Sequence, residues 1–338
     1  MPALTTHKLF AEKLLKNIDK NLIDINTYYM FSQSHDILFY YIGKNKKNYK
    51  NIGKKGHHKN TKQFIMTTIN CIKNNNLETN KQCMAFLFGI LTHYYLDATL
   101  HPYIFYKTGV YRNNDATEKY KGQHNIFERQ LDKLIYEETT NKDYKECKIH
   151  EETIPIVSLD NKTNSLIDIV YSKTYKEDNM SKTIKKGYNT MRLFHKIVVN
   201  DPKGIKYKLY KLIDKIFDTK IQAYSTSIIA NENILNLKKK NWYHPSDIKN
   251  KTNKSIIDLI DNASKECIKT INEIIKYLHD ERNDLNDIIK DIDYSTGLEI
   301  KDNKKMRYFE YWNISFLIVV YQAFYYRFNN PILILIIT

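Results

Sequence analysis

Five side chains that can bind a metal ion recur at four-residue spacing between residues 93 and 128. His93, Asp97 and His101 lie in HYYLDATLHPY, and His124 and Glu128 lie in HNIFERQLD. A four-residue step advances about 400° around an α-helix, so the first three side chains fall within about 80° of one another. The preceding run FLFGIL is apolar, and a buried carboxylate beside buried imidazoles is costly unless a cation neutralises it. Since imidazole nitrogens and carboxylate oxygens are the ligands of catalytic zinc, the spacing predicts a metal site shared by two helices.

Each of these histidines, taken alone, has a simpler interpretation. A single histidine on an apolar helix face is more often a core residue with one hydrogen bond, and the patterns HxxxD and HxxxE recur by chance. Two such patterns with a histidine between them, in a segment with little other charge, favour the metal site.

Upstream segments supply further candidate ligands. In LTTHKLFAEKLLKNI the apolar residues recur at helical spacing and place His7 on the core-facing stripe. Asp36 in QSHDILFYY lies between a polar turn and an apolar run, so its carboxylate is expected to point inward and to need a counter-charge. We expect His57 and His58 to open a helix that continues through NTKQFIMTTINCI, and the spacing favours His57 as the ligand. We expect His35 to be an exposed turn residue.

The remaining histidines and the cysteines carry no ligand pattern. The histidines without an acidic partner at ligand spacing, which we expect to be surface or packing residues, are His150, His195, His244 and His279. The cysteines form no CxxC pair and suit reduced, buried thiols; they are Cys71, Cys83, Cys147 and Cys267.

Composition and periodicity indicate an all-α protein. The 338 residues include only 9 glycines and 6 prolines, and the apolar residues recur with helical rather than alternating period. We expect a connection over 140–162, then helices near 164–177, 181–200, 204–225 and, after a WYHPSD turn, 253–280. Three parts are predicted: a metal-binding catalytic helical core at 1–140, a helical scaffold or lid packed on it at 141–311, and an apolar C-terminal helix and tail at 312–338. The apolar runs of the tail are too short to span a bilayer, so a buried helix is favoured over a membrane-surface anchor.

The net charge of +15 favours anionic partners such as phospholipid surfaces and phosphate-bearing substrates. The lysines are spread along the chain, so specific recognition of nucleic acid is not supported. No basic and apolar signal segment is visible at the N-terminus. We therefore expect a cytoplasmic protein or one bound peripherally to a membrane.

Five motifs, in this order, resemble the zinc-dependent phospholipase C family of Gram-positive bacteria. They are MPALTTHKLFAEKLL, SHDILFYY, the helix around HKNT, HYYLDATLHPY and HNIFERQLD, and the resemblance covers about residues 1–135. It implies an all-helical bundle of the type shared with P1 nuclease, with a cluster of zinc ions in a cleft. It also implies hydrolysis of glycerophospholipids to diacylglycerol and a phosphorylated head group, by attack of a metal-bound hydroxide.

The resemblance further implies ligands for two or three zinc ions. The first set is Asp36, His57, His93 and Asp97, and the second is His101, His124 and Glu128. His7 and a second oxygen of Asp97 would hold a third ion, which in the secreted members is completed by the backbone of the mature first residue. No processed start is visible in this sequence, so the third ion is left open. The counterpart of Asp36 is both ligand and base in the family, and Asp36 is our candidate catalytic base.

Two other functions fit the same residues. A zinc nuclease of the P1 type would cleave single-stranded nucleic acid with the same ligands, and a noncatalytic helical protein would bind metal or membrane without hydrolysis. Selection of a choline-like head group would need aromatic faces for cation–π contact. The aromatic residues near the ligands include Phe39, Tyr40, Tyr94 and Tyr103.

Overall fold

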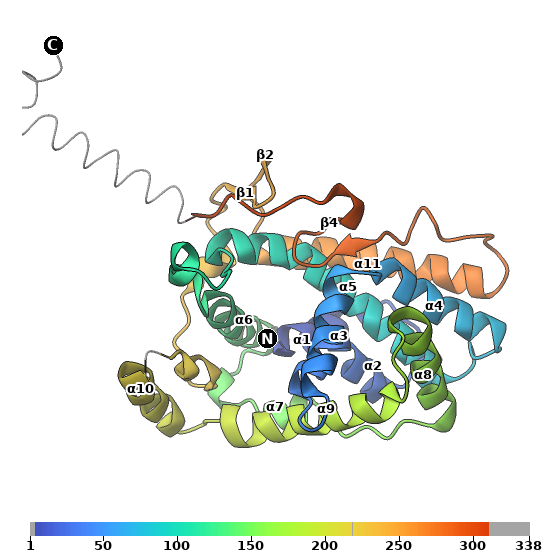
Figure 1. Ribbon diagram of the computed structural model, residues 1–338, viewed down its shortest axis with the longest axis horizontal. Coiled ribbons are helices and arrows are strands. Elements are labelled where there is room, and N and C mark those ends of the chain that lie inside the picture. The colour runs from blue at the N-terminus through green and yellow to red at the C-terminus, as the bar shows by residue number, and fades with distance from the viewer. Residues whose placement is uncertain (1–3, 218, 311–338) are drawn as a thin grey trace, which may run out of the picture.

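The computed structural model describes residues 4–217 and 219–310 (Figure 1). Within these ranges the protein is built of helices, with two short hairpins as the β-structure, which confirms the expected all-α class. The segment predicted to form an apolar helix and tail, 312–338, lies outside the described residues.

The long helix α5 (Lys81–Thr108) runs through the middle of the protein and carries three candidate ligands. It begins at Asn80, whose side chain accepts hydrogen bonds from the first free N–H groups of the helix. The helix is long and apolar enough to cross a membrane, but 83% of its most apolar 18-residue window is buried inside the protein. A Cβ at Gly89 would lie 2.7 Å from the backbone of Phe31, so the glycine lets α2 (Ile25–Phe31) pack directly on this helix. α5 is therefore the core helix of the fold.

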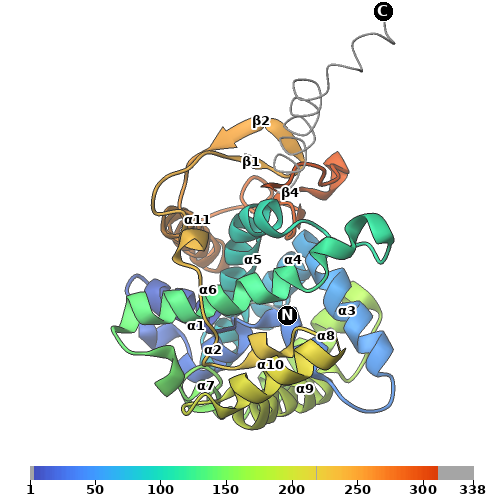
Figure 2. The same cartoon turned by 90° about the vertical axis from the view of Figure 1, so that its left-hand side faces the viewer.

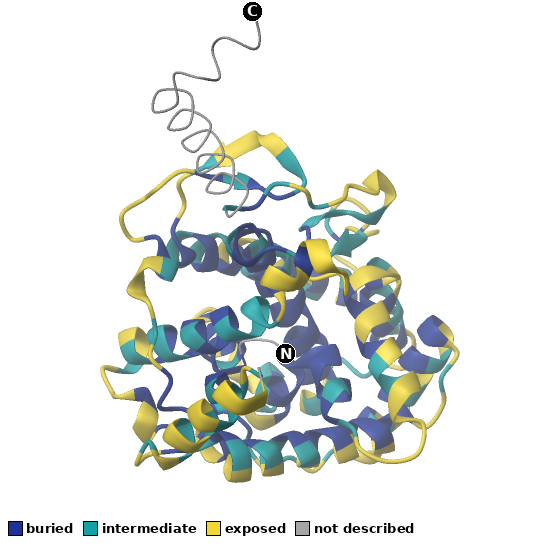
Figure 3. Cartoon of the chain, turned by 60° about the vertical axis from the view of Figure 1, so that its left-hand side comes forward, coloured by how far each residue is buried: buried dark blue, intermediate teal, exposed yellow. Residues whose placement is uncertain are grey.

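Helices from several parts of the chain pack around α5. α1 (Leu4–Leu14), α4 (Thr61–Asn74), α6 (Gln123–Thr140) and α11 (Ile256–Leu278) all pack against it, and α11 begins with a capping box formed by Ser255 and Asp258. α8 (Asn161–Tyr175) covers α4, and α9 (Met180–Phe194) packs on the 3₁₀ segment η2 (Ser34–Tyr40). Buried residues lie on the inward sides of these helices and exposed residues on their outer sides (Figure 3). In a view turned by 90°, α6 and α10 (Ile205–Phe217) face the reader (Figure 2).

Short elements connect the long helices. The 3₁₀ turns are η1 (Lys20–Leu22), η3 (Asp115–Tyr120), η4 (Tyr144–Glu146), η6 (Ile221–Tyr224), η7 (Glu232–Leu235) and η8 (Ile300–Asp302). A single helical turn, α7 (Ile149–Glu152), follows η4, and a π-helical turn, η5 (His195–Val199), extends α9. Strand β1 (Trp242–His244) pairs antiparallel with β2 (Asp247–Thr252), and β3 (Ile292–Asp293) with β4 (Leu298–Glu299).

Several predicted boundaries are wrong. His57 and His58 end α3 (Lys46–His58) instead of opening α4, because Lys59 is extended and Asn60 is left-handed, with φ 59°. Asparagine tolerates this conformation better than most residues, so the dipeptide separates two helices. The 140–162 connection contains η4 and α7, and the predicted 204–225 helix is α10 followed by η6. The WYHPSD turn joins two strands that are too short to show an alternating pattern in the sequence.

Candidate metal centre

The structure brings all eight predicted ligands into one cluster. α5 supplies His93, Asp97 and His101, and α6 supplies His124 and Glu128. The others come from three separate elements: His7 from α1, Asp36 from η2 and His57 from the end of α3. All of these side chains are buried except His124, which is 27% exposed.

The first donor set is Asp36, His57 and His93, whose ligand atoms lie within 4.8 Å of one another. Nε2 of His57 lies 3.2 Å from Nε2 of His93 and 3.2 Å from Oδ1 of Asp36. Nδ1 of His57 lies 2.7 Å from the carbonyl oxygen of Gly53, and Nδ1 of His93 lies 3.1 Å from that of Ser32. Because only an N–H group donates to a carbonyl, both rings carry a proton on Nδ1.

With the proton on Nδ1, Nε2 of a neutral imidazole carries a lone pair and can bind a cation. Burial lowers the pKa of His93 to about 4 in spite of the nearby Asp97 carboxylate, so this imidazole is neutral at pH 7. Its Nε2 then presents a lone pair toward His57, and Oδ2 of Asp36 is buried with no hydrogen-bond partner among the described residues. Electron-rich atoms held this close together in a buried site repel unless a positive charge lies among them. Burial lowers the pKa of His57, but the Asp36 and Asp97 carboxylates outweigh burial and raise it, so either a metal ion or a proton on Nε2 of His57 supplies that charge. Fixing the ring through its other nitrogen is also how metal-binding histidines are oriented.

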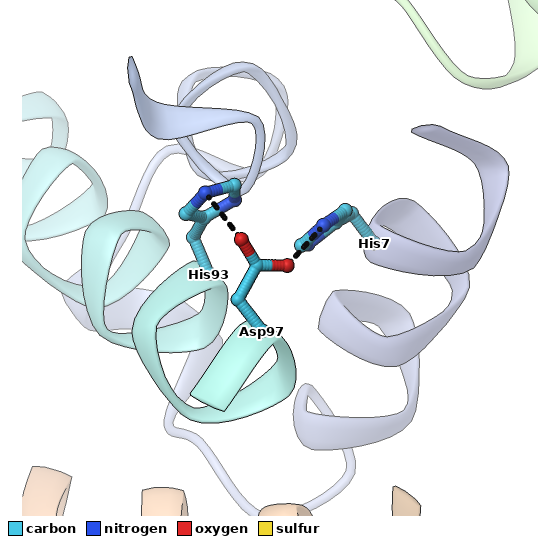
Figure 4. Close-up of side chains that lie close together, drawn as sticks. All are labelled: His7, His93 and Asp97. Atoms are coloured by element: carbon cyan, nitrogen blue, oxygen red, sulfur yellow. Dashed lines mark ion pairs between the residues drawn. The ribbon is translucent and has the colours of Figure 1, made fainter. Parts of the chain in front are cut away.

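Asp97 lies between His93 and His7 (Figure 4). Its Oδ1 is 3.0 Å from Nε2 of His7, and its Oδ2 is 3.3 Å from Nε2 of His93 and 3.6 Å from Nε2 of His57. Burial raises the pKa of this carboxyl, but His101, His93 and His7 together outweigh burial and hold the pKa well below its usual value. Asp97 is therefore ionised, and its two oxygens face different partners, as a carboxylate that bridges two cations would.

The second donor set is His101, His124 and Glu128. Oε1 of Glu128 lies 3.1 Å from Nε2 of His124 and 3.4 Å from Nε2 of His101. Nδ1 of His101 donates to the carbonyl oxygen of Tyr294 at 3.2 Å, which again directs Nε2 toward the donor set. Burial raises the pKa of Glu128, but His124 and His101 lower it further, to below the usual range, so the carboxylate is charged.

His7 occupies a different position from the other histidines. It forms a donor group with His93 and Asp97, but its Nδ1 is buried without a hydrogen-bond partner among the described residues. No carbonyl of the described residues fixes its ring, and Nε2 of His93 already belongs to the first set. The donors exclusive to a third ion are thus His7 and Oδ1 of Asp97 among residues 4–217 and 219–310.

The structure separates His57 from its neighbours His58 and His35. His58 belongs to no donor set and pairs with Asp293, Nδ1 to Oδ1 at 3.2 Å, with 45% of its side chain exposed. The expectation that His35 is exposed is wrong, since only 1% of it is accessible. It fits beneath α3 because Gly56 has no side chain: a Cβ there would lie 2.2 Å from the imidazole. Burial and the nearby His57 lower the pKa of His35 well below its usual value, so it is a neutral packing residue.

The other side chains without a ligand pattern behave as packing or surface residues. His150, His195 and His244 are buried away from the cluster, and His279 is exposed. The four cysteines are free and buried, as expected.

Aromatic residues around the site differ in their access to it. Phe39 lines the cavity beside the ligands and stacks on His57, with ring centroids 6.0 Å apart. Tyr40, Tyr94 and Tyr103 are buried core residues outside that lining. Phe105, which was not predicted, stacks on His124 with centroids 4.6 Å apart and also lines the cavity.

The 291–297 segment is a part of the site that sequence reasoning missed. Tyr294 donates its N–H to the carbonyl oxygen of His57 at 2.9 Å, accepts the His101 hydrogen bond, and packs its ring on His57 and His93. Gly297 has φ +64°, and a Cβ there would lie 2.3 Å from the carbonyl oxygen of Ala98. Glycine thus lets this segment rest directly on α5. Nothing in DIDYSTG resembles a ligand pattern, so no local signal marks it.

Two adjoining cavities lead to the ligands. The inner cavity, about 140 Å³, is lined by Asp36, Asp97, Glu128 and several of the histidines. The outer cavity, about 870 Å³, shares His58, Phe105, His124 and Ser295 with it. A molecule in the outer cavity can therefore reach the donor sets.

An all-α bundle with two sets of histidine and carboxylate donors defines a helical metalloprotein. Residues 6–196, more than half of the 338-residue chain, match the family model described as zinc-dependent phospholipase C. The chain therefore belongs to the zinc-dependent phospholipase C family, and all eight candidate ligands lie within the matched range. No curated protein and no solved structure gives a significant match.

Proposed function

We propose that this protein hydrolyses glycerophospholipids to diacylglycerol and a phosphorylated head group, using zinc ions held by the two donor sets. The observation that carries the proposal is the pair of Nε2 atoms of His57 and His93, 3.2 Å apart, with both Nδ1 atoms committed to backbone carbonyls. This arrangement beside ionised Asp97 suits a cation, and the ligand chemistry suits zinc.

Each residue of the site has a role in this proposal. The zinc ions, when bound, would supply positive charge for the phosphoryl oxygens and make water a stronger acid. Asp36 lines the inner cavity and orients the attacking water, whose proton it accepts. Asp97 holds both sides of the cluster together, and His101, His124 and Glu128 complete the second set. The third ion, at His7, remains a prediction.

The outer cavity supports an anionic substrate. Four cationic residues line it: Arg112, Lys304, Lys305 and Arg307. Among the described residues of this lining the one carboxylate is Asp293, which is paired with His58. The volume of about 870 Å³ is that of a small-molecule site. Such a surface attracts the phosphodiester and, together with the net charge of +15, a membrane that contains anionic lipid.

Head-group release from a phospholipid, measured with zinc-loaded protein, tests the proposal. We expect His93→Ala and Glu128→Ala to abolish release, and His279→Ala, an exposed histidine outside both cavities, to retain it. Single-stranded DNA is the competing substrate, because a basic cavity beside zinc also suits a P1-type nuclease. Cleavage of DNA without cleavage of any phospholipid would refute the phospholipase proposal, and zinc binding with neither activity would identify a noncatalytic protein.

A further inference from the structure

α10 and the end of α9 expose an unusual number of large apolar side chains. Seven of them, each more than half exposed, form what we name the α10 patch: Leu193, Ile197, Ile205, Leu209, Leu212, Ile216 and Phe217. No residue of α10 is buried, although the helix is 13 residues long. Isolated exposed apolar residues are normal, but a contiguous group marks a surface that binds something.

Four of the five α10 residues of the patch form one face of an amphipathic helix. At 100° per residue, Ile205, Leu209, Leu212 and Ile216 fall within about 60° of one another around the α10 axis. The opposite face of the helix packs on η6, and the Tyr210 hydroxyl donates to the carbonyl oxygen of Val198 at 3.0 Å. The helix is thus attached to the protein by its polar side, and its apolar side points to solvent.

Between residues 193 and 217 the exposed charged side chains are all lysines. Between residues 193 and 217 the carboxylates are Asp201 and Asp214, and both are turned inward. Asp201 accepts hydrogen bonds from the N–H groups of Lys206 and Tyr207, and Asp214 accepts them from the N–H groups of Ile221 and Gln222.

Exposed lysines then flank the apolar stripe. They are Lys208, Lys211 and Lys215, all on one side of it. An apolar stripe beside lysines, with the carboxylates sequestered, is the pattern of a helix that lies in the interface of an anionic bilayer.

We infer that the α10 patch docks this protein on membranes that contain anionic phospholipid, with α10 lying in the plane of the interface. A second copy of the chain fits less well, because two lysine-flanked patches on proteins of net charge +15 repel each other. α10 lies on the same side of the molecule as α6, which carries His124 and Glu128 (Figure 2). The chain just beyond α10 reaches the outer cavity, since a Cβ at Gly122 of its lining would lie 3.3 Å from the Lys220 side chain. Docking there would therefore place the outer cavity beside the lipid; this role of docking, though not the binding itself, rests on the proposed function.

Co-sedimentation of the full chain with vesicles tests the inference. Wild-type protein should bind vesicles of phosphatidylcholine with phosphatidylglycerol and bind pure phosphatidylcholine more weakly. The double variant Leu209→Gln/Leu212→Gln should bind the anionic vesicles at least about 10-fold more weakly, since each buried leucine contributes a factor of that order. Ile156→Gln is the matched control, because Ile156 is 76% exposed and lies outside the patch.

A water-soluble, short-chain phospholipid separates docking from catalysis. The double variant should hydrolyse this monomeric substrate within twofold of the wild-type rate and lose activity on vesicles only. Unchanged vesicle binding by the double variant would overturn the inference, as would a wild-type dimer that the same substitutions convert to a monomer. If no phospholipid is hydrolysed but vesicle binding still depends on the patch, the proposed function fails and the docking surface stands.

Discussion

Zinc content and zinc-dependent stability should distinguish His57 from His58, two neighbours on the same helical turn. His57 is buried with its Nε2 facing His93 and Asp36, whereas His58 pairs with Asp293 and belongs to no donor set. We expect His57→Ala to lose one equivalent of zinc and His58→Ala to lose none. The pair is well matched because both substitutions remove the same atoms from adjacent residues.

The size of the stability change follows from ligand linkage. An ion present at 1,000 times its dissociation constant stabilises the folded state by about 4.1 kcal/mol. At about 2.1 cal/mol/K per residue, 338 residues give an unfolding entropy of about 0.7 kcal/mol/K. The loss of one site therefore lowers the melting temperature by about 6 °C.

Thermal unfolding of each variant with zinc and after chelation isolates this effect. The quantity compared is the zinc-dependent increase in melting temperature, so that any packing defect of the zinc-free variant cancels. Elemental analysis of the loaded proteins gives the stoichiometry. Equal zinc-dependent increases for the two variants, or fewer than two equivalents in wild-type protein, would refute the assignment of the donor sets.

Three further predictions concern the surroundings of the site. Gly297→Ala should lower the free energy of unfolding in urea by about 1–3 kcal/mol, because of its φ of +64° and the clash with Ala98. Gly122→Ala is the control and should cost less, because Gly122 has φ +73° but its Cβ would lie 3.3 Å from a flexible lysine side chain. Equal losses for the two variants would contradict the packing described for the 291–297 segment. Burial and Arg129 lower the pKa of His195 to about 3. Stability is therefore lost as pH falls below the unfolded value of about 6.5, by about 2 kcal/mol at pH 5, and urea unfolding at pH 7 and 5 should show a smaller loss for His195→Phe. The double variant Lys305→Glu/Arg307→Glu should raise KM for phospholipid several-fold with kcat little changed, and steady-state kinetics showing the reverse would remove the outer cavity from substrate binding.

The ligands on α5 and α6 could be predicted because helical geometry is local. His93, Asp97 and His101 follow from four-residue steps, and so do His124 and Glu128. Their convergence with His7 and His57 required the family resemblance, because no short-range rule brings α1 and the end of α3 to α5. The boundary between α3 and α4 was missed because it depends on the left-handed conformation of one residue, Asn60, which follows the last turn of α3 almost directly.

Whether a single side chain is buried or exposed was harder to predict when it depended on packing between distant segments. His35 was expected in solvent, but Gly56 on another helix makes room for it. The 291–297 segment carries no ligand, and its contribution is a backbone carbonyl and a tyrosine ring placed by contacts more than 190 residues apart. Sequence patterns report which side chains can bind a metal, and they do not report which carbonyls orient them.

The hydrogen bonds of Tyr294 bear on when the site is completed during synthesis. All eight ligands have been made once translation passes residue 128, but the carbonyl that orients His101 and the N–H that holds His57 come from residue 294. At about 5–20 residues per second, the ribosome needs roughly 8–33 s to add the intervening residues. A nascent chain in this interval carries the full complement of donors without their final anchoring. Final anchoring of the donors is thereby tied to synthesis of residue 294, long after the last ligand has left the ribosome's active site.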